Sequence, residues 1–460
     1  MVHASTGRRE ALSGGRRDIR NVCLFEPGPS FPTPFLQYRV PRLGLILLGT
    51  ILRRAGYRVE VFLSDDYPAF AGAVKHADVV GVSAITATAH EAYRACDMAR
   101  AAGAVTILGG PHPTFLPAEA AQHADVVVRG EAESVILSVI RAIDGDPDAA
   151  EALPSSTPTP IAVVGSHERC DLDRVPTPDF SLVHGGDIEA YPVQTSRGCD
   201  KHCTFCSVRK MFGNGIRERS IRRIRDDIAP LRGKPLFICD DNFGANCTRD
   251  RGVLEMLVRS DLVPARWSTQ VCTDVAGHPE LLSLMRETNA HFLCVGFESS
   301  SASQLAAYRK EQDLDRMWRS ADVLHSWGFK IHGMFILGGD EETADDVERT
   351  LGFAEKAALE SAQFLALTPL PGTELAARLE EEGRVLTHDW RYYDGQHVVF
   401  RPRLMSVDDL ASALVEARRR IPACPRDSVR GPNTAVSQSR ERTVGPRELG
   451  TGALGRGGPL

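Results

Sequence analysis

The sequence predicts an α/β protein of two successive units, an amino-terminal doubly wound parallel sheet and a partial barrel of about six βα repeats. Short apolar runs rich in β-branched residues alternate with helical patterns over residues 21–150, and again over residues 191–402. This alternation is typical of parallel sheets covered by helices. Residues 151–190 are rich in Pro, Ser and Thr, separate the two alternations and predict a linker.

Five strands are expected in the first unit. The apolar runs that predict them occupy residues 22–25, 57–63, 79–83, 105–108 and 126–128. Helical patterns follow three of them, at residues 41–55, up to about residue 102, and after the fifth strand. Ligands of doubly wound sheets bind beyond the carboxyl ends of the strands. Ser83 and the pair Gly109 and Gly110 lie at such ends and are candidates for a binding site.

Six strands are expected in the second unit, the first of them at Val193. The other five apolar runs occupy residues 236–239, 266–272, 292–297, 330–337 and 363–368. Function in βα barrels gathers at the carboxyl ends of the strands. The residues found there are Asp240, Asp241, Glu298, Ser299 and Gly338. Beyond the barrel, we expect one helix within residues 403–421 and a disordered tail over residues 422–460.

Composition places the chain among soluble proteins. It has 460 residues, of which 43% are hydrophobic and 25% charged. A net charge of −6 gives no basic footprint for nucleic acid. A run of about 18 apolar residues is absent from the sequence, so no membrane span is expected.

The cysteine usage and the amino terminus both favour the cytoplasm. Residues 1–20 are rich in Arg, lack the apolar segment of a signal peptide and predict a disordered leader. The 11 cysteines show no paired spacing typical of a secreted disulfide framework. We therefore expect a reducing cytoplasm.

Three cysteines lie close together in one short stretch, residues 194–212. Cys199, Cys203 and Cys206 have the spacing C-x3-C-x2-C, so that their thiolates can converge on one metal cluster. A [4Fe–4S] cluster normally takes four cysteines, and three would leave one iron open to a ligand other than protein. The alternative is a structural zinc site, for which His202 is an available fourth ligand.

The cysteine loop, with Gly198 before it and Phe205 before its last cysteine, closely resembles that of the radical S-adenosylmethionine (SAM) superfamily. The resemblance implies that the three cysteines hold a [4Fe–4S] cluster whose open iron chelates SAM. One electron, supplied by a flavodoxin- or ferredoxin-type donor, then cleaves SAM to a 5′-deoxyadenosyl radical. That radical removes a hydrogen atom from a small-molecule substrate.

The same resemblance implies several SAM contacts. Phe205 would lie near the adenine, Asp240 and Asp241 near the amino group, and Glu298 with Ser299 near the ribose. The segment around Gly338 resembles the adenine-binding strand, although Asp340 and Glu341 depart from its usual form. Gln270 could point into the barrel, and Cys272 follows it where relatives often have Arg. Phe205 as a core aromatic and the aspartates as strand-end caps remain the alternatives.

The remaining cysteines need no second metal site. Cys239, Cys272 and Cys294 fall on expected barrel strands, and Cys247 lies just after one. None of them has C-x2-C spacing. A buried cysteine behaves as a small apolar side chain, and we expect that role for these four.

The amino-terminal unit resembles the Rossmann-like B12-binding (cobalamin-binding) domain of one radical SAM subclass. The resemblance is carried by residues 41–44, 81–83, 109–114 and 129–133. It implies a cobalamin site at Ser83, Gly109, Gly110 and His112, although His112 could also cap its own turn. The D-x-H-x-x-G segment that supplies histidine to cobalt elsewhere is absent from the sequence, as it is in many members of the subclass.

Three functions fit these features. The first is cobalamin-assisted methylation of an unactivated carbon, and the second is cobalamin-free radical dehydration or rearrangement, as in aminoglycoside biosynthesis. The third is a zinc- or cluster-containing binding protein without turnover. The short region after residue 402 favours a compact enzyme acting on a small molecule, for example a specialised metabolite. Glu342, Asp241 and Tyr308 are candidates for an acid or base acting on the substrate.

Overall fold

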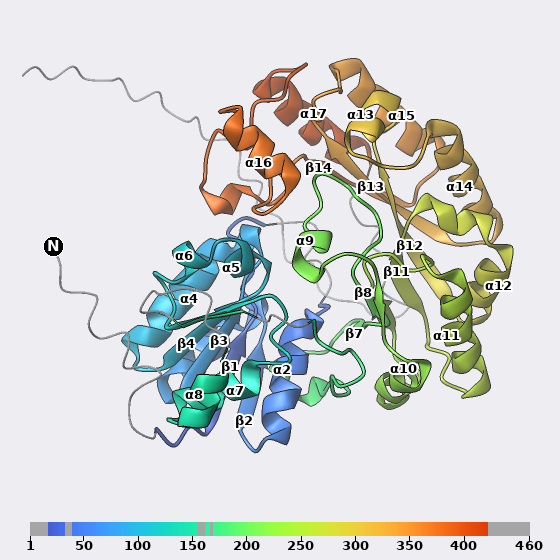
Figure 1. Ribbon diagram of the computed structural model, residues 1–460. Helices are drawn as coiled ribbons and strands as arrows, with labels where there is room; N and C mark the ends of the chain where they lie inside the picture. Colours follow the sequence, from blue (N-terminus) through green and yellow to red (C-terminus); the bar gives the residue numbers. More distant parts are fainter. Residues whose placement is uncertain (1–16, 33–38, 154–161, 166–168, 422–460) are drawn as a thin grey trace, which may run out of the picture. The chain divides into compact units, whose positions relative to one another are not determined.

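Two six-stranded parallel sheets organise the computed structural model, which describes residues 17–32, 39–153, 162–165 and 169–421 (Figure 1). The expected leader up to residue 16 and the expected tail, residues 422–460, lie outside the described residues. Among the residues that are described, no helix is long and apolar enough to cross a membrane.

The first sheet contains all five expected strands. Its members are β1 (Asn21–Phe25), β2 (Arg58–Phe62), β3 (Val79–Ser83), β4 (Val105–Gly109), β5 (Val126–Arg129) and β6 (Ala162–Gly165). They pair in parallel in the order β2-β1-β3-β4-β5-β6. The chain moves outward in opposite directions from β1 and β3. The carboxyl ends of these two strands are therefore the expected place for a ligand.

Strand β6 lies within the stretch that the sequence suggested as a linker. Its backbone pairs with β5, from Val126 opposite Ala162 to Arg129 opposite Gly165. The strand has four residues, Ala-Val-Val-Gly, between segments rich in Pro, Ser and Thr. So short a run carries too little periodicity to be distinguished from a loop.

Helices cover both faces of this sheet (Figure 1). They are α2 (Leu43–Arg54), α3 (Tyr67–Ala73), α4 (Ala89–Ala101), α5 (Pro111–Phe115), α6 (Pro117–Ala120), α7 (Ile136–Ile143) and α8 (Pro147–Ala152). Leu52 of α2 and Ile140 of α7 pack in a core on one face. Phe70 of α3 and Ala92 of α4 pack in a core on the other. The predicted doubly wound arrangement is confirmed.

The second sheet contains the six strands expected of the partial barrel. They are β7 (Tyr191–Val193), β10 (Leu236–Ile238), β11 (Trp267–Val271), β12 (Ala290–Glu298), β13 (Lys330–Leu337) and β14 (Ser361–Ala366). All pairs are parallel, in the order β14-β13-β12-β11-β10-β7. Their carboxyl ends therefore meet at one end of the barrel, where the polar residues predicted from the sequence lie.

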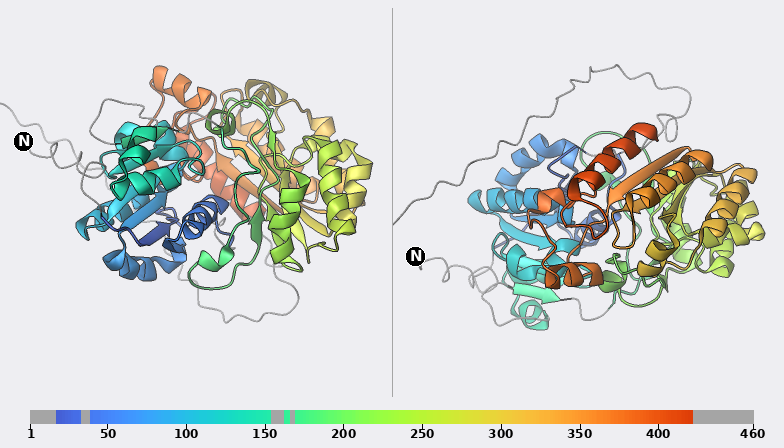
Figure 2. Two further views of the ribbon diagram at one scale, coloured as in Figure 1. Left: turned by 60° about the horizontal axis from the view of Figure 1, so that its bottom comes forward. Right: turned by 90° about the horizontal axis from the view of Figure 1, so that it is seen from above.

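The barrel helices lie outside the strands, as the yellow and green ribbons of Figure 2 show. They are α10 (Ile221–Ile228), α11 (Cys247–Arg259), α12 (Pro279–Glu287), α13 (Ala302–Ala307), α14 (Leu314–Ser326) and α15 (Ala344–Lys356). Three further helices are α9 (Val208–Phe212), α16 (Glu374–Glu381) and α17 (Val407–Arg420). Helix α17 confirms the helix expected after the barrel, and its Leu410 and Leu414 pack into the barrel core.

Alternation along the strands identifies the inner wall of the barrel. Trp267 and Val271 of β11 belong to the core between strands and helices. Because side chains of a strand alternate between its two faces, Gln270 points to the opposite, inner side. The same argument applies to His332, which pairs in register with Cys294 on one side and Ser361 on the other.

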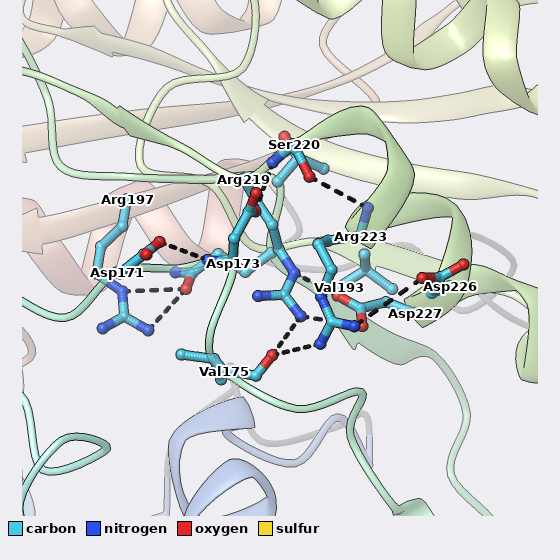
Figure 3. Close-up of polar contacts among 12 residues, drawn as sticks. Asp171, Asp173, Val175, Val193, Arg197, Arg219, Ser220, Arg223, Asp226 and Asp227 are labelled. Carbon is cyan, nitrogen blue, oxygen red and sulfur yellow. Dashed lines mark hydrogen bonds and ion pairs between the residues drawn. The ribbon is translucent and has the colours of Figure 1, made fainter.

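Two arginines, Arg219 and Arg223, bind the backbone of the segment that precedes the barrel (Figure 3). Arg219 Nη2 and Arg223 Nη2 each donate a hydrogen bond of 2.8 Å to the Val175 carbonyl. Arg219 Nε also donates to Asp227 Oδ2 at 2.7 Å, and both side chains are buried. Arg219 follows strand β9 (Arg217–Glu218), which pairs with β8 (Ser196–Arg197) directly before the cysteine loop. This frame fixes where the loop begins.

Candidate active site

A glycine sets the turn that leads into the cysteine loop. Gly198 has a φ of +93°, a conformation that other residues adopt only with strain. A Cβ at this position would also lie 2.5 Å from the Gly215 carbonyl oxygen. Both observations explain why glycine stands immediately before Cys199.

Asp240 and Asp241, at the end of β10, hold the same turn. The Asp240 carboxylate accepts hydrogen bonds from Thr195 N at 2.6 Å and from Ser196 Oγ at 2.7 Å, and the residue is 1% exposed. Asp241 Oδ2 accepts from Gly198 N at 2.8 Å. Burial raises the pKa of both carboxyls, against these hydrogen bonds. Their contact with the SAM amino group stays a prediction, while their role in supporting the loop is visible.

The three cysteines of the loop are partly buried. Burial raises the pKa of each thiol, Cys199, Cys203 and Cys206, to about 11 in the metal-free chain. Iron binds the thiolate, so loading a cluster would release protons here. Three thiols on one braced loop fit the donor set of a cluster with one open iron.

The structure shows the surroundings of two side chains near the cysteines, His202 and Cys272. His202, the fourth ligand of the zinc alternative, has its Nδ1 against the Arg209 guanidinium. Over the described ranges, no three His, Cys, Asp or Glu side chains meet closely enough to hold a single metal ion. Cys272, like Cys239, Cys247 and Cys294, is half-buried rather than buried as expected, and its charge would couple to those of Cys199 and Cys203.

Glu298 is turned into the barrel mouth by an irregularity of β12. The pairing of β12 with β13 shifts register between Gly296 and Glu298, and Glu298 has a φ of +65°. Such a bulge re-aims a side chain at the end of a strand. Glu298 Oε1 accepts from Lys310 Nζ at 2.8 Å, and both side chains are 11% exposed. Burial would lower the pKa of Lys310, but Glu298 outweighs it and raises that pKa.

Ser299 and Gly338 meet through a buried carboxylate, Glu342. Ser299 Oγ donates to Glu342 Oε1 at 2.8 Å, and Gly338 N donates to Glu342 Oε2 at 2.7 Å. Burial raises the pKa of Glu342 to about 7, despite these hydrogen bonds. The two residues predicted to contact SAM are thus joined at the ends of β12 and β13, and Glu342 is the link.

Phe205 packs edge-on against Tyr308. Their ring centroids are 4.9 Å apart, with an angle of 74° between the planes. Both belong to an apolar cluster with Leu375 and Phe400, so Phe205 is also part of a core. This contact joins the cysteine loop to the segment that follows α13.

A cavity of about 470 Å³ opens at the carboxyl ends of the first sheet. Ser83, Gly109 and Gly110, predicted from the sequence, all line it. Phe237 and Cys239, at the end of β10, line it as well, so that it reaches barrel residues. Residues of the first sheet and residues of the barrel thus line the same cavity.

The inner part of this cavity lies between the sheet and helices α2 and α7. Its wall there is apolar and includes Leu24, Ile107 and Ile140. A Cβ built on Gly44, at the start of α2, would have no atom within 4 Å, so this stretch of the wall is open. A ligand with a flat apolar part and a polar part fits these surroundings.

His112 belongs to a separate polar cluster. It is 0% exposed, its Nε2 lies 2.9 Å from the Tyr93 hydroxyl, and it is not among the residues that line the cavity. Glu119 Oε1 accepts from Tyr93 at 2.9 Å and from Trp390 Nε1 at 2.7 Å. His112 therefore supports the contact between the first sheet and the segment after the barrel. A role for it in cobalamin binding stays a prediction.

Arg197, two residues before Cys199, is held by two glutamates that follow β5. Its Nη1 lies 3.0 Å from Glu131 Oε1, and its Nη2 lies 2.7 Å from Glu133 Oε1. All three side chains are at most 8% exposed and line the cavity. We call this group the Arg197 clamp. It ties the carboxyl end of the first sheet to the base of the cysteine loop.

Sequence reasoning missed the partners rather than the sites. The clamp glutamates belong to the segment 129–133 that resembles B12-binding domains, but nothing in a single sequence pairs them with Arg197. Lys310 lies in a loop 12 residues beyond Glu298. Its position follows no strand-end pattern, so no local signal could have identified it.

Two successive parts of the chain match known families. Residues 36–140 match the B12 binding domain, and residues 193–354 match the radical SAM superfamily. The second match begins at β7 and ends within α15, and it contains the cysteine loop and the bulge at Glu298.

Individual relatives are distant but cover most of the chain. The chain is 27% identical to bacteriochlorophyllide d C-12(1)-methyltransferase of Chlorobaculum tepidum, over 75% of this chain and 74% of that protein. It is 26% identical to the anaerobic magnesium-protoporphyrin IX monomethyl ester cyclase of Rubrivivax gelatinosus, over 83% and 73%.

A solved structure shares the fold. The radical SAM methyltransferase TsrM of Kitasatospora setae, solved with cobalamin and a [4Fe–4S] cluster bound, aligns with a TM-score of 0.63. The alignment covers 79% of this chain and 78% of TsrM at 16% identity. With both family matches and this arrangement of sheets, the chain is a radical SAM enzyme in which a B12-binding domain precedes the radical SAM domain.

Proposed function

We propose that the chain is a cobalamin-dependent radical SAM methyltransferase that methylates a carbon atom of a small molecule. The observation that carries this proposal is the shared cavity. Ser83, Gly109 and Gly110 of the first sheet and Phe237 and Cys239 of the barrel line one space. A group bound at the first sheet would therefore be exposed to the barrel, where the substrate is expected.

Cys199, Cys203 and Cys206 would hold the [4Fe–4S] cluster, with SAM at its open iron. When bound, the cluster and cobalamin supply electron transfer and methyl transfer, which no side chain can perform. The protein positions these groups. Asp240 and Asp241 fasten the turn before Cys199, and Glu298 and Lys310 form an ion pair at the neighbouring strand end.

The cavity suits cobalamin in its chemistry. Its apolar inner part, between the first sheet and helices α2 and α7, would accept the flat nucleotide base of the cofactor. Ser83 and the glycines at the carboxyl ends of β3 and β4 would let the corrin ring approach the backbone closely. His112 lies outside the lining, and its role in cobalamin binding stays a prediction.

Two features favour methylation over the alternatives. Bacteriochlorophyllide d C-12(1)-methyltransferase is a methyltransferase by name and resembles the chain over three-quarters of its length. TsrM, also a methyltransferase, shares the fold. The relative that is a cyclase keeps ring formation open as a second function.

The inner wall of the barrel indicates the character of the substrate. Gln270, Ser361 and Gln363 present neutral polar groups there. His332 contacts Ser361 Oγ at 2.7 Å through its Nδ1, and burial lowers the pKa of its imidazole. A neutral molecule that forms hydrogen bonds suits this wall better than a strongly charged one. A flavodoxin- or ferredoxin-type protein would supply the electrons.

Anaerobic reconstitution tests the proposal. The protein is loaded with iron, sulfide and hydroxocobalamin, desalted, and assayed for iron and corrinoid per chain. It is then reduced with SAM present. Retained corrinoid, with S-adenosylhomocysteine as well as 5′-deoxyadenosine among the products, supports methyl transfer. 5′-Deoxyadenosine alone from protein without corrinoid would favour the cobalamin-free reaction, and a closed zinc site without SAM cleavage would contradict both.

A further inference from the structure

Tyr308 combines nearly complete burial with an unused hydroxyl. The residue is 2% exposed, and its hydroxyl has no hydrogen-bond partner among the residues that the structure describes. Buried polar atoms are almost always hydrogen-bonded, and each exception needs an explanation. One explanation is a ligand that supplies the missing partner.

The position of Tyr308 identifies the ligand site. Its carbonyl oxygen accepts a hydrogen bond from Thr204 N at 3.2 Å, and the Ala307 carbonyl accepts from Thr204 Oγ1 at 3.4 Å. Thr204 lies between Cys203 and Phe205, and the Tyr308 ring packs on Phe205 at 4.9 Å. Tyr308 therefore lies directly against the part of the loop that joins the second and third cysteines.

Three carboxylates act on Tyr308, those of Glu342, Glu298 and Asp340, and each also binds another group. Burial, and the charges of Glu342 and Glu298 close by, raise the pKa of Tyr308 well above its usual value. Glu298 is paired with Lys310 at 2.8 Å, and Glu342 accepts from Ser299 at 2.8 Å. The phenol thus stays protonated at neutral pH and keeps a free donor at the ends of β12 and β13.

We propose that Tyr308 binds SAM by donating its hydroxyl hydrogen bond to an acceptor atom of that ligand. The inference rests on the proposed function, because SAM must chelate the iron held by Cys199, Cys203 and Cys206. A ligand at that iron lies against the loop, and Tyr308 is packed on the same loop. SAM offers ring nitrogens, ribose oxygens and a carboxylate as acceptors.

The test is Tyr308→Phe in the reconstituted, cluster-loaded protein. The substitution keeps the ring and its contact with Phe205 and removes only the hydroxyl. We expect the same iron content and, without SAM, an unchanged or higher melting temperature, since no protein partner is lost. The dissociation constant for SAM, measured by anaerobic isothermal titration, should rise about tenfold. The rise in melting temperature caused by SAM should shrink accordingly.

Tyr393→Phe is the matched control. Tyr393 is 3% exposed, but its hydroxyl donates to the Thr387 carbonyl at 2.8 Å. This variant should lower the melting temperature, because a part-buried hydrogen bond to the Thr387 carbonyl is lost, and should leave the SAM dissociation constant unchanged. If Tyr308 binds SAM, Tyr308→Phe therefore changes the SAM dissociation constant but does not lower the melting temperature, and Tyr393→Phe does the reverse.

Three results would overturn the proposal for Tyr308. They are an unchanged SAM dissociation constant in Tyr308→Phe, a loss of iron in that variant, or an effect confined to substrate binding. Wild-type protein that carries a cluster but binds no SAM would contradict the proposed function instead. The ratio of the SAM dissociation constants of Tyr308→Phe and wild type therefore tests the role of Tyr308. SAM binding by the wild type alone tests the proposed function.

Discussion

Gly296 lies directly beneath Lys310. A Cβ built on Gly296 would be 3.0 Å from Lys310 Nζ and 2.7 Å from Glu298 Oε1. The missing side chain leaves the space in which the Glu298–Lys310 ion pair forms. Because Gly296 has no side chain, the Glu298–Lys310 ion pair has room at the barrel mouth.

Gly296→Ala should displace this ion pair without unfolding the barrel. The atoms that the new methyl group would meet are the far ends of two flexible side chains, which can move at small cost. We expect the SAM dissociation constant to rise about tenfold, with iron content unchanged. Anaerobic titration with SAM, together with the melting temperature, measures both effects.

Gly352→Ala is the control for this substitution. Gly352 lies within helix α15, and a Cβ there would have no atom within 4 Å. Alanine should stabilise the helix by up to about 1 kcal/mol and leave SAM binding as it is. If both glycine variants bind SAM equally well, the space under Lys310 has no role in the site.

Replacing one member of the Glu298–Lys310 pair should lower the free energy of unfolding more than the loss on replacing both members would suggest. Either Glu298→Ala or Lys310→Met leaves one buried charge unpaired and should lower the free energy of unfolding by about 3 kcal/mol. The double variant should lose less than the sum of the two. Urea unfolding of the cluster-free protein measures this, and Glu298→Ala should also weaken SAM binding while the cluster still assembles. Additive losses would show that the two charges do not interact.

The cysteines of the loop should differ from Cys272 in iron retention. Cys199→Ala, Cys203→Ala and Cys206→Ala each remove a cluster ligand and should abolish SAM cleavage, with iron content reduced. Cys272→Ala should keep its iron, because the loop supplies the three ligands without it. Full iron and activity in any loop variant would contradict the assignment. Iron loss in Cys272→Ala would show that Cys272 is a ligand as well.

The sequence was sufficient for the two sheets because most strands are short segments rich in apolar, often β-branched residues that alternate with helical patterns. The four residues of β6 are too few to show a strand pattern, so the composition around them predicts a linker instead. The polar residues predicted at strand ends do lie there, because their positions follow from those of the strands. Their orientation was not predictable, since alternation does not show whether Asp240 faces a ligand or its own loop.

The partners of these residues come from distant parts of the chain. Glu133 is 64 residues from Arg197, and Trp390 is 271 residues from Glu119. Such pairs depend on how complete elements pack, which one sequence does not encode in a local pattern. The cysteine loop is the opposite case, because its three ligands and its glycine lie within nine residues and Gly198 acts on the backbone next to it.

The Arg197 clamp should contribute to stability in a manner that salt does not screen. Glu133→Gln removes one charge from a buried group and should lower the free energy of unfolding by roughly 1–3 kcal/mol. Because the side chains are at most 8% exposed, the loss should persist in 1 M salt. Urea unfolding at low and high salt measures it.

Glu119→Gln is the matched control for the clamp. Glu119 also contacts a distant segment, through Trp390, but its side chain is 34% exposed, and Tyr93 and Trp390, which donate to it, carry no charge. We expect a loss of about 1 kcal/mol or less. A loss in Glu133→Gln that disappears in 1 M salt would show that the clamp is open to solvent.

Glu342 should make stability fall as the pH rises. Its pKa is about 7 in the folded protein against an ordinary value of 4.5. Between these values the folded chain holds a proton that the unfolded chain has lost, so raising the pH favours unfolding. Each pH unit in that window costs about 1.4 kcal/mol, or roughly 3 kcal/mol in all. The loss is complete above about pH 7.

Glu342→Gln removes this titration while its amide oxygen can still accept from Gly338. Measured by urea unfolding, the variant should gain roughly 2–3 kcal/mol relative to wild type between pH 5 and pH 8. Glu341→Gln, at the exposed neighbouring position, makes the same charge change and should run parallel to wild type. Parallel curves for Glu342→Gln would mean that the buried carboxyl is ionised throughout. Ser299 and Gly338 would then be joined by a charge rather than by a neutral acid.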